Sequence, residues 1–122
     1  MTEITPTGNI TVIDGPTVRA GESLSDAIDL AAQQGKAIAG LIVPFDMPTT
    51  YITFQLSQGP DDFRDLWSVN GSQVSIYINP GARMVFDTNW SLVADFLKIR
   101  CGTSVHPIVQ PVDRVFKTII ST

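Results

Sequence analysis

The stretch YITFQLSQGPDDFRDLW, residues 51–67, decides the fold class of this chain. From 51 to 57, large apolar side chains occupy the even positions, and the odd positions carry residues that tolerate water. In an extended chain this alternation gives one wet face and one dry face, and the dry face needs a second sheet to cover it. The turn signal QGPD at 58–61 precedes a second apolar pattern at Phe63, Leu66 and Trp67. The stretch therefore predicts a strand, a reversal and a returning strand.

Similar short segments recur along the chain at spacings near ten residues, separated by turns rich in Gly, Pro and Asn. The pair Asn70-Gly71 predicts a hairpin, because both residues tolerate the positive φ that a two-residue turn demands. Residues 37–44, AIAGLIVP, are almost wholly apolar and predict a buried central strand. The full pattern predicts an all-β, single-domain, jelly-roll-like β-sandwich of eight to nine short antiparallel strands over 10–122, preceded by an extended N-terminal arm over 1–9.

Two segments near the N-terminus need a separate argument. In residues 10–19 a β-branched run stops at Asp14-Gly15-Pro16 and extended character resumes at Thr17, so we expect a hairpin. Residues 22–32, ESLSDAIDLAA, place Ser23 and Asp26 at the spacing of a helix cap, with apolar residues at helical spacing. Propensity alone favours a short helix there. The all-β neighbours, and the resemblance given below, favour a strand over about residues 25–30, which is our expectation.

Composition narrows the function classes. The 122 residues are 43% hydrophobic but only 16% charged, where about 25% charged is usual. A surface so poor in charge favours an assembly subunit over a free monomer. The net charge is −4 and no basic run occurs, so we expect no nucleic-acid binding. The sequence shows neither a signal peptide nor an apolar stretch of membrane-spanning length, so we expect synthesis in a cytoplasm and no membrane partner.

Residues that could carry chemistry are few. Cys101 is the only cysteine and His106 the only histidine, so neither a disulfide nor a one-chain zinc site is possible, and no nucleophile signature surrounds either. Cys101 lies in an apolar run and is expected to be a small buried hydrophobe. The acidic segment 61–65 lacks the spacing of a calcium loop and contains Arg64, which indicates a solvated turn. We therefore expect no catalytic, cofactor-binding or metal-binding residue, and no enzyme.

Apolar and aromatic residues outside the expected core suggest two kinds of binding surface. A loop on a free monomer is normally polar, yet the loop after the central strand carries Phe45 and Met47. Aromatic residues and Met are enriched at subunit interfaces. The predicted interface residues are Ile4, Phe45, Met47 and Trp90. The aromatic residues that could instead stack on a sugar are Tyr51, Trp67, Tyr77 and Trp90.

Three segments together suggest a family: GESLSDAIDL (21–30), LIVPFDMPTTYITFQLSQGPDDFRDLW (41–67) and FLKIRCGTSVHPIVQPVDRVFKTII (96–120). They resemble small virion proteins of tailed bacteriophages and prophages over nearly the whole domain. The residues that carry the resemblance are Leu30, Pro44, Thr53, Phe54, Gln55, Ser57, Phe63, Asp65, Leu66, Lys98, Arg100, Gly102, Thr103 and Gln110. The late F-x-K-x-R strand also looks like that of the galactose-binding, discoidin-like sandwich. Cys101 departs from the pattern, where a Ser or another small residue is expected.

The resemblance implies a non-enzymatic role on a capsid surface, as a decoration (cement) protein or as the base of a head spike. The implied partners are the major capsid protein or other virion proteins, with a symmetric homo-oligomer, a trimer by preference, located on the virion. The alternative function is a glycan-binding, discoidin-like adhesion module of a virion or tail. That alternative requires Trp67, Trp90 or Tyr77 to be exposed beside polar groups such as Asn89 or Arg83.

Overall fold

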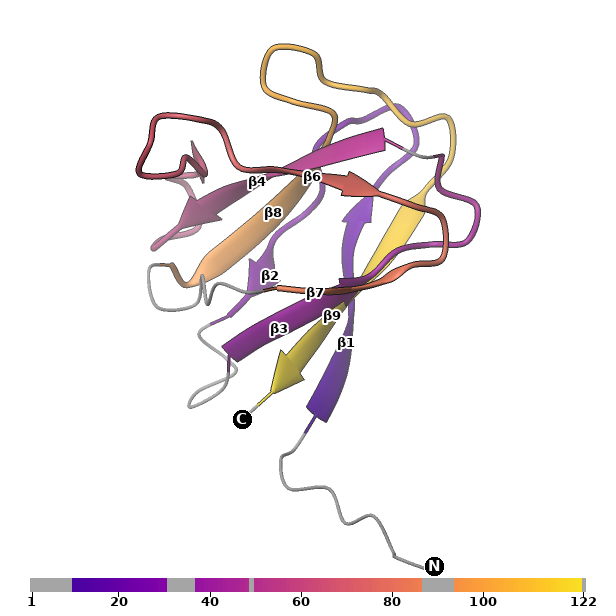
Figure 1. Ribbon diagram of the computed structural model, residues 1–122, viewed down its shortest axis with the longest axis horizontal. Coiled ribbons are helices and arrows are strands. Elements are labelled where there is room, and N and C mark those ends of the chain that lie inside the picture. The colour runs from indigo at the N-terminus through magenta and orange to yellow at the C-terminus, as the bar shows by residue number, and fades with distance from the viewer. Residues whose placement is uncertain (1–9, 31–36, 49, 87–93, 122) are drawn as a thin grey trace, which may run out of the picture.

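The computed structural model describes residues 10–30, 37–48, 50–86 and 94–121, which form nine strands and no helix. The strands are β1 Ile10–Val18, β2 Ile28–Asp29, β3 Ala37–Ile42, β4 Thr50–Ser57, β5 Arg64–Asp65, β6 Ser75–Ile78, β7 Arg83–Val85, β8 Phe96–Cys101 and β9 Arg114–Ser121. They form two antiparallel sheets, which appear as two layers in Figure 1. The prediction of an all-β sandwich with eight or nine strands is confirmed.

The first sheet has four strands in the order β1-β9-β3-β7, and the second has five. The second sheet is built around β4, the strand predicted from residues 51–57. Along one edge β4 pairs with β8, while β6 and β5 share its other edge, at residues 50–53 and 55–56 respectively. The expected central strand at 37–44 is β3, which lies between β9 and β7.

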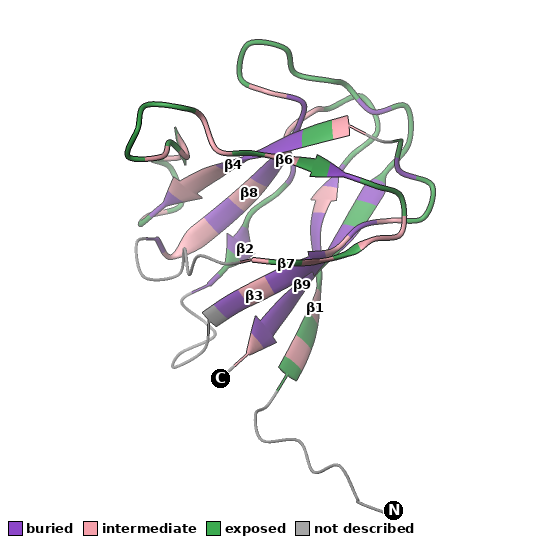
Figure 2. Ribbon diagram, viewed as in Figure 1, coloured by how far each residue is buried: buried purple, intermediate pink, exposed green. Residues whose placement is uncertain are grey.

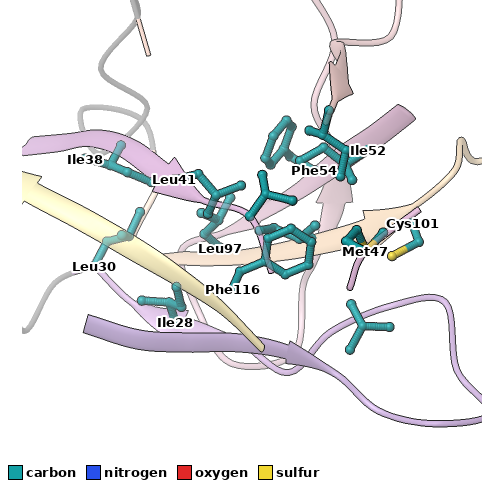
Figure 3. Packing of buried hydrophobic residues seen from close by; sticks show 14 of the residues in the cluster. Ile28, Leu30, Ile38, Leu41, Met47, Ile52, Phe54, Leu97, Cys101 and Phe116 are labelled. Atoms are coloured by element: carbon teal, nitrogen blue, oxygen red, sulfur yellow. The ribbon is translucent and has the colours of Figure 1, made fainter. Parts of the chain in front are cut away.

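The dry faces of the two sheets meet in one core. Ile52 and Phe54 of β4 and Leu97 of β8 come from the second sheet, and Leu41 of β3 and Phe116 of β9 from the first; all five are wholly buried. Figure 3 shows these side chains packed between the layers. The even-numbered apolar side chains of β4 therefore face the core, as their alternation predicts, and pack against the other sheet.

The expected hairpin in residues 10–19 is wrong. Both halves of the segment belong to β1 and pair with β9, with a register shift between Asp14 and Thr17. Gly15 takes a φ of 113° at this irregularity, and its carbonyl accepts a hydrogen bond of 2.9 Å from the hydroxyl of Thr118. Gly15 and Pro16 therefore form a bulge in β1, because the residues on both sides of them pair with β9.

The segment at 22–30 is extended, as expected, and forms no helix. It contributes the two-residue strand β2 and an isolated bridge between Leu24 and Arg100. Ser25 bonds twice to Ile99 of β8: its backbone N–H donates to the Ile99 carbonyl, and its hydroxyl accepts from the Ile99 N–H, both at 2.8 Å. These bonds to the sheet edge replace the local bonds that a helix would have made.

The face of β4 that points away from the core is only partly exposed to solvent. Thr53 is fully buried and Ser57 nearly so, although both lie on the side that faces away from the core. The Thr53 hydroxyl donates to the carbonyl of Gly102 at 3.0 Å, and the Ser57 hydroxyl accepts from the N–H of Gly59 at 3.1 Å. Neighbouring segments therefore cover this face at Thr53 and Ser57, while Tyr51 stays exposed and Gln55 is partly exposed.

Candidate functional site

The outer face of the four-stranded sheet carries a line of apolar residues that is exposed at its two ends. Residues directly opposite one another in antiparallel strands share a face, and the register places Val12, Ile119, Gly40 and Val85 in line across β1, β9, β3 and β7. We call these four positions the apolar row. Val12 is 46% exposed and Val85 is 86% exposed. With strands about 4.8 Å apart, the row is roughly 14 Å long.

Gly40 makes the middle of the apolar row flat. A Cβ atom at this position would collide with the carbonyl oxygen of Met84 and would lie 3.4 Å from Cδ1 of Ile119. The Ile119 side chain therefore reaches over the glycine and is only 8% exposed. The result is an apolar strip without a protruding side chain at its centre.

A second row on the same face carries charges. It consists of Asp14, Lys117, Ile42 and Arg83, in line across the same four strands. The Lys117 ammonium lies 3.9 Å from the Asp14 carboxylate, and both side chains are at least half exposed. An apolar strip beside a polar margin is the usual composition of a protein interface.

Of the predicted interface residues, Phe45 is 90% exposed. The Phe45 ring lies over Gly81, so a Cβ atom added to that glycine would be 2.5 Å from Cδ1 of Phe45. The prediction for Met47 is wrong, because its side chain is 1% exposed and belongs to the core (Figure 3). The Met47 N–H bonds to the carbonyl of Pro44, so the loop turns inward after Phe45. Ile4 and Trp90 lie outside the described residues.

The outer face of the five-stranded sheet has a different character. Tyr51 of β4 and Tyr77 of β6 are directly opposite and meet edge to face, with ring centroids 4.9 Å apart. Trp67 lies opposite Gln73, which precedes the start of β6 and is on the same side of the sheet as Tyr77. The two tyrosines and the tryptophan are 51–56% exposed, and Figure 2 shows the exposure of β6. We call the outward side of β4, β5, β6 and β8, with Trp67, the aromatic face.

Polar side chains at the centre of the aromatic face are held in a network. The Arg100 guanidinium lies 2.9 Å from the Asp65 carboxylate, and these side chains are only 11% and 25% exposed. The Gln55 amide donates to the same Asp65 oxygen at 3.3 Å, and Arg100 also donates to the Thr53 hydroxyl at 3.4 Å. Each group therefore has a fixed orientation before any ligand arrives.

Lys98 adds a charge that the network does not balance. Its ammonium lies 4.3 Å from the ring centroid of Phe63, which in turn meets Phe96 edge to face. Lys98 forms no ion pair with any described residue. Arg100 is paired with Asp65, so Lys98 is the cation of this face without an ion pair to a described residue, although the Asp29 carboxylate lies on the outward side of the neighbouring β2, opposite Phe96.

Sequence reasoning identified the aromatic residues of this face but missed its polar network. The sequence predicts a solvated acidic turn around Asp65, yet the Asp65 carboxylate pairs with Arg100, and it is Asp62 that pairs with Arg64 at the surface, at 3.2 Å. One signal was present: five residues of the family resemblance, namely Thr53, Gln55, Asp65, Lys98 and Arg100, lie together on this face.

The two residues with the most reactive side chains do not form a site. Cys101 is fully buried, as expected, and burial raises the pKa of its thiol to about 11, although the nearby charge of Arg114 acts in the opposite direction. His106 is exposed in the loop that follows β8. One side chain therefore faces the core and the other faces solvent.

A cleft of about 320 Å³ opens between the edges of β1 and β2. Three carboxylates line it, but Asp26 already accepts the N–H of Thr17 at 2.9 Å and faces Arg19 at 3.6 Å, and Asp14 faces Lys117. Across the described ranges, no group of three or more His, Cys, Asp or Glu side chains is arranged to hold a metal ion. No helix in those ranges has the length and apolar character needed to cross a membrane.

Comparison with known proteins gave no relative. No protein-family model matches the chain. No curated protein and no solved structure matches it either. The two outer faces of the sandwich are therefore the basis for any functional assignment.

Proposed function

We propose that this chain is a non-enzymatic structural protein of a tailed-bacteriophage virion, which binds the capsid surface as a symmetric oligomer, a trimer, and decorates or stabilises it. The observation that carries the proposal is the apolar row across the four-stranded sheet. The family resemblance supplies the context of the virion, and the partners are the major capsid protein and further copies of this chain.

The exposed members of the row are Val12 and Val85 at its two ends, and they flank a flat, buried centre formed by Gly40 and Ile119. The row spans all four strands, and Ile10, which is 69% exposed, extends it at the start of β1. Covering the strip with another protein would release water from apolar surface, while the charged row beside it would set the orientation of the partner. Phe45, in the loop after β3, is a further exposed apolar residue.

Capsid decoration is suited to an interface of this modest size. A row roughly 14 Å long cannot provide high affinity by itself. When copies of the chain also contact one another on a repeating lattice, each attachment raises the effective concentration for the next. The many weak contacts then act together, so no single contact needs to be strong.

Binding to particles provides the direct test. The purified chain is added to particles isolated from source cells that lack it, and co-sedimentation is measured for the wild type, for Val85→Asp and for the control Val69→Asp. Val69 is even more exposed than Val85 but lies in the connection between β5 and β6. We expect the wild type and Val69→Asp to saturate the particles and Val85→Asp to bind at least about tenfold more weakly, because a buried unpaired carboxylate is costly.

Light scattering behind a sizing column, at two concentrations, measures the mass of the wild type in solution. We expect three times the chain mass of 13.2 kDa. Particles that neither contain nor bind the chain would contradict the proposed role, and equal binding by both aspartate variants would exclude the apolar row as the attachment surface.

A further inference from the structure

We propose that the aromatic face binds an acidic oligosaccharide, with sugar rings stacked on Tyr51, Tyr77 and Trp67 and a sugar carboxylate directed to Lys98. This binding function lies on the sheet opposite the apolar row and is separate from capsid attachment. The aromatic rings, the polar network around Asp65 and the Lys98 ammonium would each contact a different part of the ligand.

The three aromatic rings provide the stacking surface. A pyranose ring has an apolar face of C–H groups and a rim of hydroxyls, so it packs on an aromatic ring while its rim remains free to form hydrogen bonds. Tyr51, Tyr77 and Trp67 are each about half exposed. Their hydroxyl and indole N–H groups bond to no described residue. The rings therefore offer both contact area and free polar edges.

The central network provides fixed partners for sugar hydroxyls. Asp65 uses one carboxylate oxygen to accept from Arg100 and Gln55, and its side chain is still 25% exposed. A carboxylate can accept about four hydrogen bonds in total. Because Arg100 and Gln55 already fix its orientation, a ligand would lose little entropy in ordering it.

Charge favours an acidic sugar over a neutral one. Lys98 forms no ion pair with a described residue, in a chain whose net charge is −4. A carboxylate on the ligand would complete an ion pair there, next to the apolar ring of Phe63, where water screens it less than in the open. A neutral sugar could use the rings but would leave this charge unused.

The dimensions favour an oligosaccharide. Tyr51 and Gln55 lie on the same side of β4, four residues apart, and a strand advances about 3.3 Å per residue, so they are separated by roughly 13 Å. Lys98 is directly opposite Gln55 on β8. Stacking at Tyr51 and a carboxylate at Lys98 therefore belong to different sugar units of one ligand. Single-stranded nucleic acid also stacks on aromatic rings, but one free cation cannot match a run of phosphates.

The test uses a glycan array on which sialylated and uronic-acid oligosaccharides are printed beside their carboxyl-reduced forms, with an oligothymidylate spot as the nucleic-acid probe. The acidic sugar that binds best is then titrated by calorimetry against four variants. Tyr77→Ala removes a ring, and Tyr77→Phe keeps it. Lys98→Met removes the charge, and Val85→Asp, on the outer face of the other sheet, is the surface control.

We expect carboxylated sugars to bind and their reduced forms to bind at least about tenfold more weakly. Tyr77→Ala should lose about tenfold in affinity, Tyr77→Phe should remain within about threefold, and Lys98→Met should bind both sugar forms equally. Circular dichroism melting of each variant separates lost binding from lost folding. Binding to oligothymidylate alone, an array without any bound sugar, or unchanged affinity of folded Tyr77→Ala would each overturn the proposal.

Discussion

Cys101 ends β8 with its thiol enclosed by the core. The thiolate would lose its hydration there, so the neutral form is favoured and the pKa is raised from 9.0 to about 11. Below pH 9 the thiol is protonated in both the folded and the unfolded chain. Between pH 9 and 11 the unfolded chain loses this proton and the folded chain keeps it, so the free energy of unfolding falls as the pH rises.

This linkage gives a test at a single residue. The wild type should lose up to roughly 3 kcal/mol of stability from this group between pH 8 and 11. Cys101→Ala should be about 1 kcal/mol less stable than the wild type at pH 8, because of the small cavity, and should lack this part of the pH dependence. Urea unfolding at several pH values measures both. Parallel pH profiles for the two proteins would show that burial does not shift the thiol.

At the scale of elements, one buried arginine connects segments that are far apart in sequence. Arg114, at the start of β9, is 6% exposed. Its Nε donates to the side chain of Gln110 at 2.9 Å, and one terminal nitrogen donates to the Asp46 carbonyl at 2.9 Å and lies 3.2 Å from the Asp46 carboxylate. The backbone of Gln110 in turn bonds to Gly21 and Glu22. The cluster thus joins the β1–β2, β3–β4 and β8–β9 connections.

Removing the guanidinium should therefore loosen three loops together. Arg114→Met leaves the Gln110 oxygen and the Asp46 carbonyl without their donor, and we expect a loss of about 2–4 kcal/mol in the free energy of unfolding. Asp46→Asn is the matched control. The Asp46 side chain is 70% exposed and its backbone contact survives, so this variant should lose less than about 1 kcal/mol. Equal losses in urea unfolding would mean that the ion pair with the Asp46 carboxylate matters, not the hydrogen bonds to Gln110 and the Asp46 carbonyl.

The strands differ in how far the sequence determines them. The alternation at 51–57 and 96–101 predicted both the structure and the inward faces of β4 and β8, because period-two patterns record burial directly. The local pattern failed at 10–19, where Gly15-Pro16 suggested a turn. A bulge resulted because β9, about a hundred residues away, pairs with both halves of β1. Pairing with a strand so distant in sequence cannot be predicted from a short segment of the sequence alone.

At the scale of the whole molecule, the two outer faces should act independently, since they lie on opposite sides of the core. We expect Val85→Asp to lose particle attachment and keep sugar affinity, and Tyr77→Ala to do the reverse. Sedimentation with particles and calorimetry with the acidic sugar, carried out on the same protein preparations, measure both functions. Loss of both by either variant would show that one surface, or the fold itself, serves both.

The candidate sites were only partly predictable. Sequence reasoning named Tyr51, Trp67 and Tyr77 as stacking residues and Phe45 as an exposed loop residue, because aromatic side chains at polar positions can be seen in one dimension. It could not find the apolar row, whose members are 12, 40, 85 and 119, since only the pairing register aligns them. The prediction of Met47 as an interface residue was wrong for a related reason. The loop that carries Met47 is held by a hydrogen bond from Arg114, about seventy residues later in the sequence.

The register of β1 and β9 also determines how the molecule would respond to mechanical force. Ile10 begins β1 and lies opposite Ser121, the last residue of β9, so the ends of these two strands are neighbours. The hydrogen bonds of an antiparallel pair are perpendicular to the strands. A pull that separates Ile10 from Ser121 would load these bonds one after another, like a zipper. Tension carried between residues 10 and 121 would therefore open the β1–β9 pair easily, whereas tension directed along the two strands would load all of its hydrogen bonds at once.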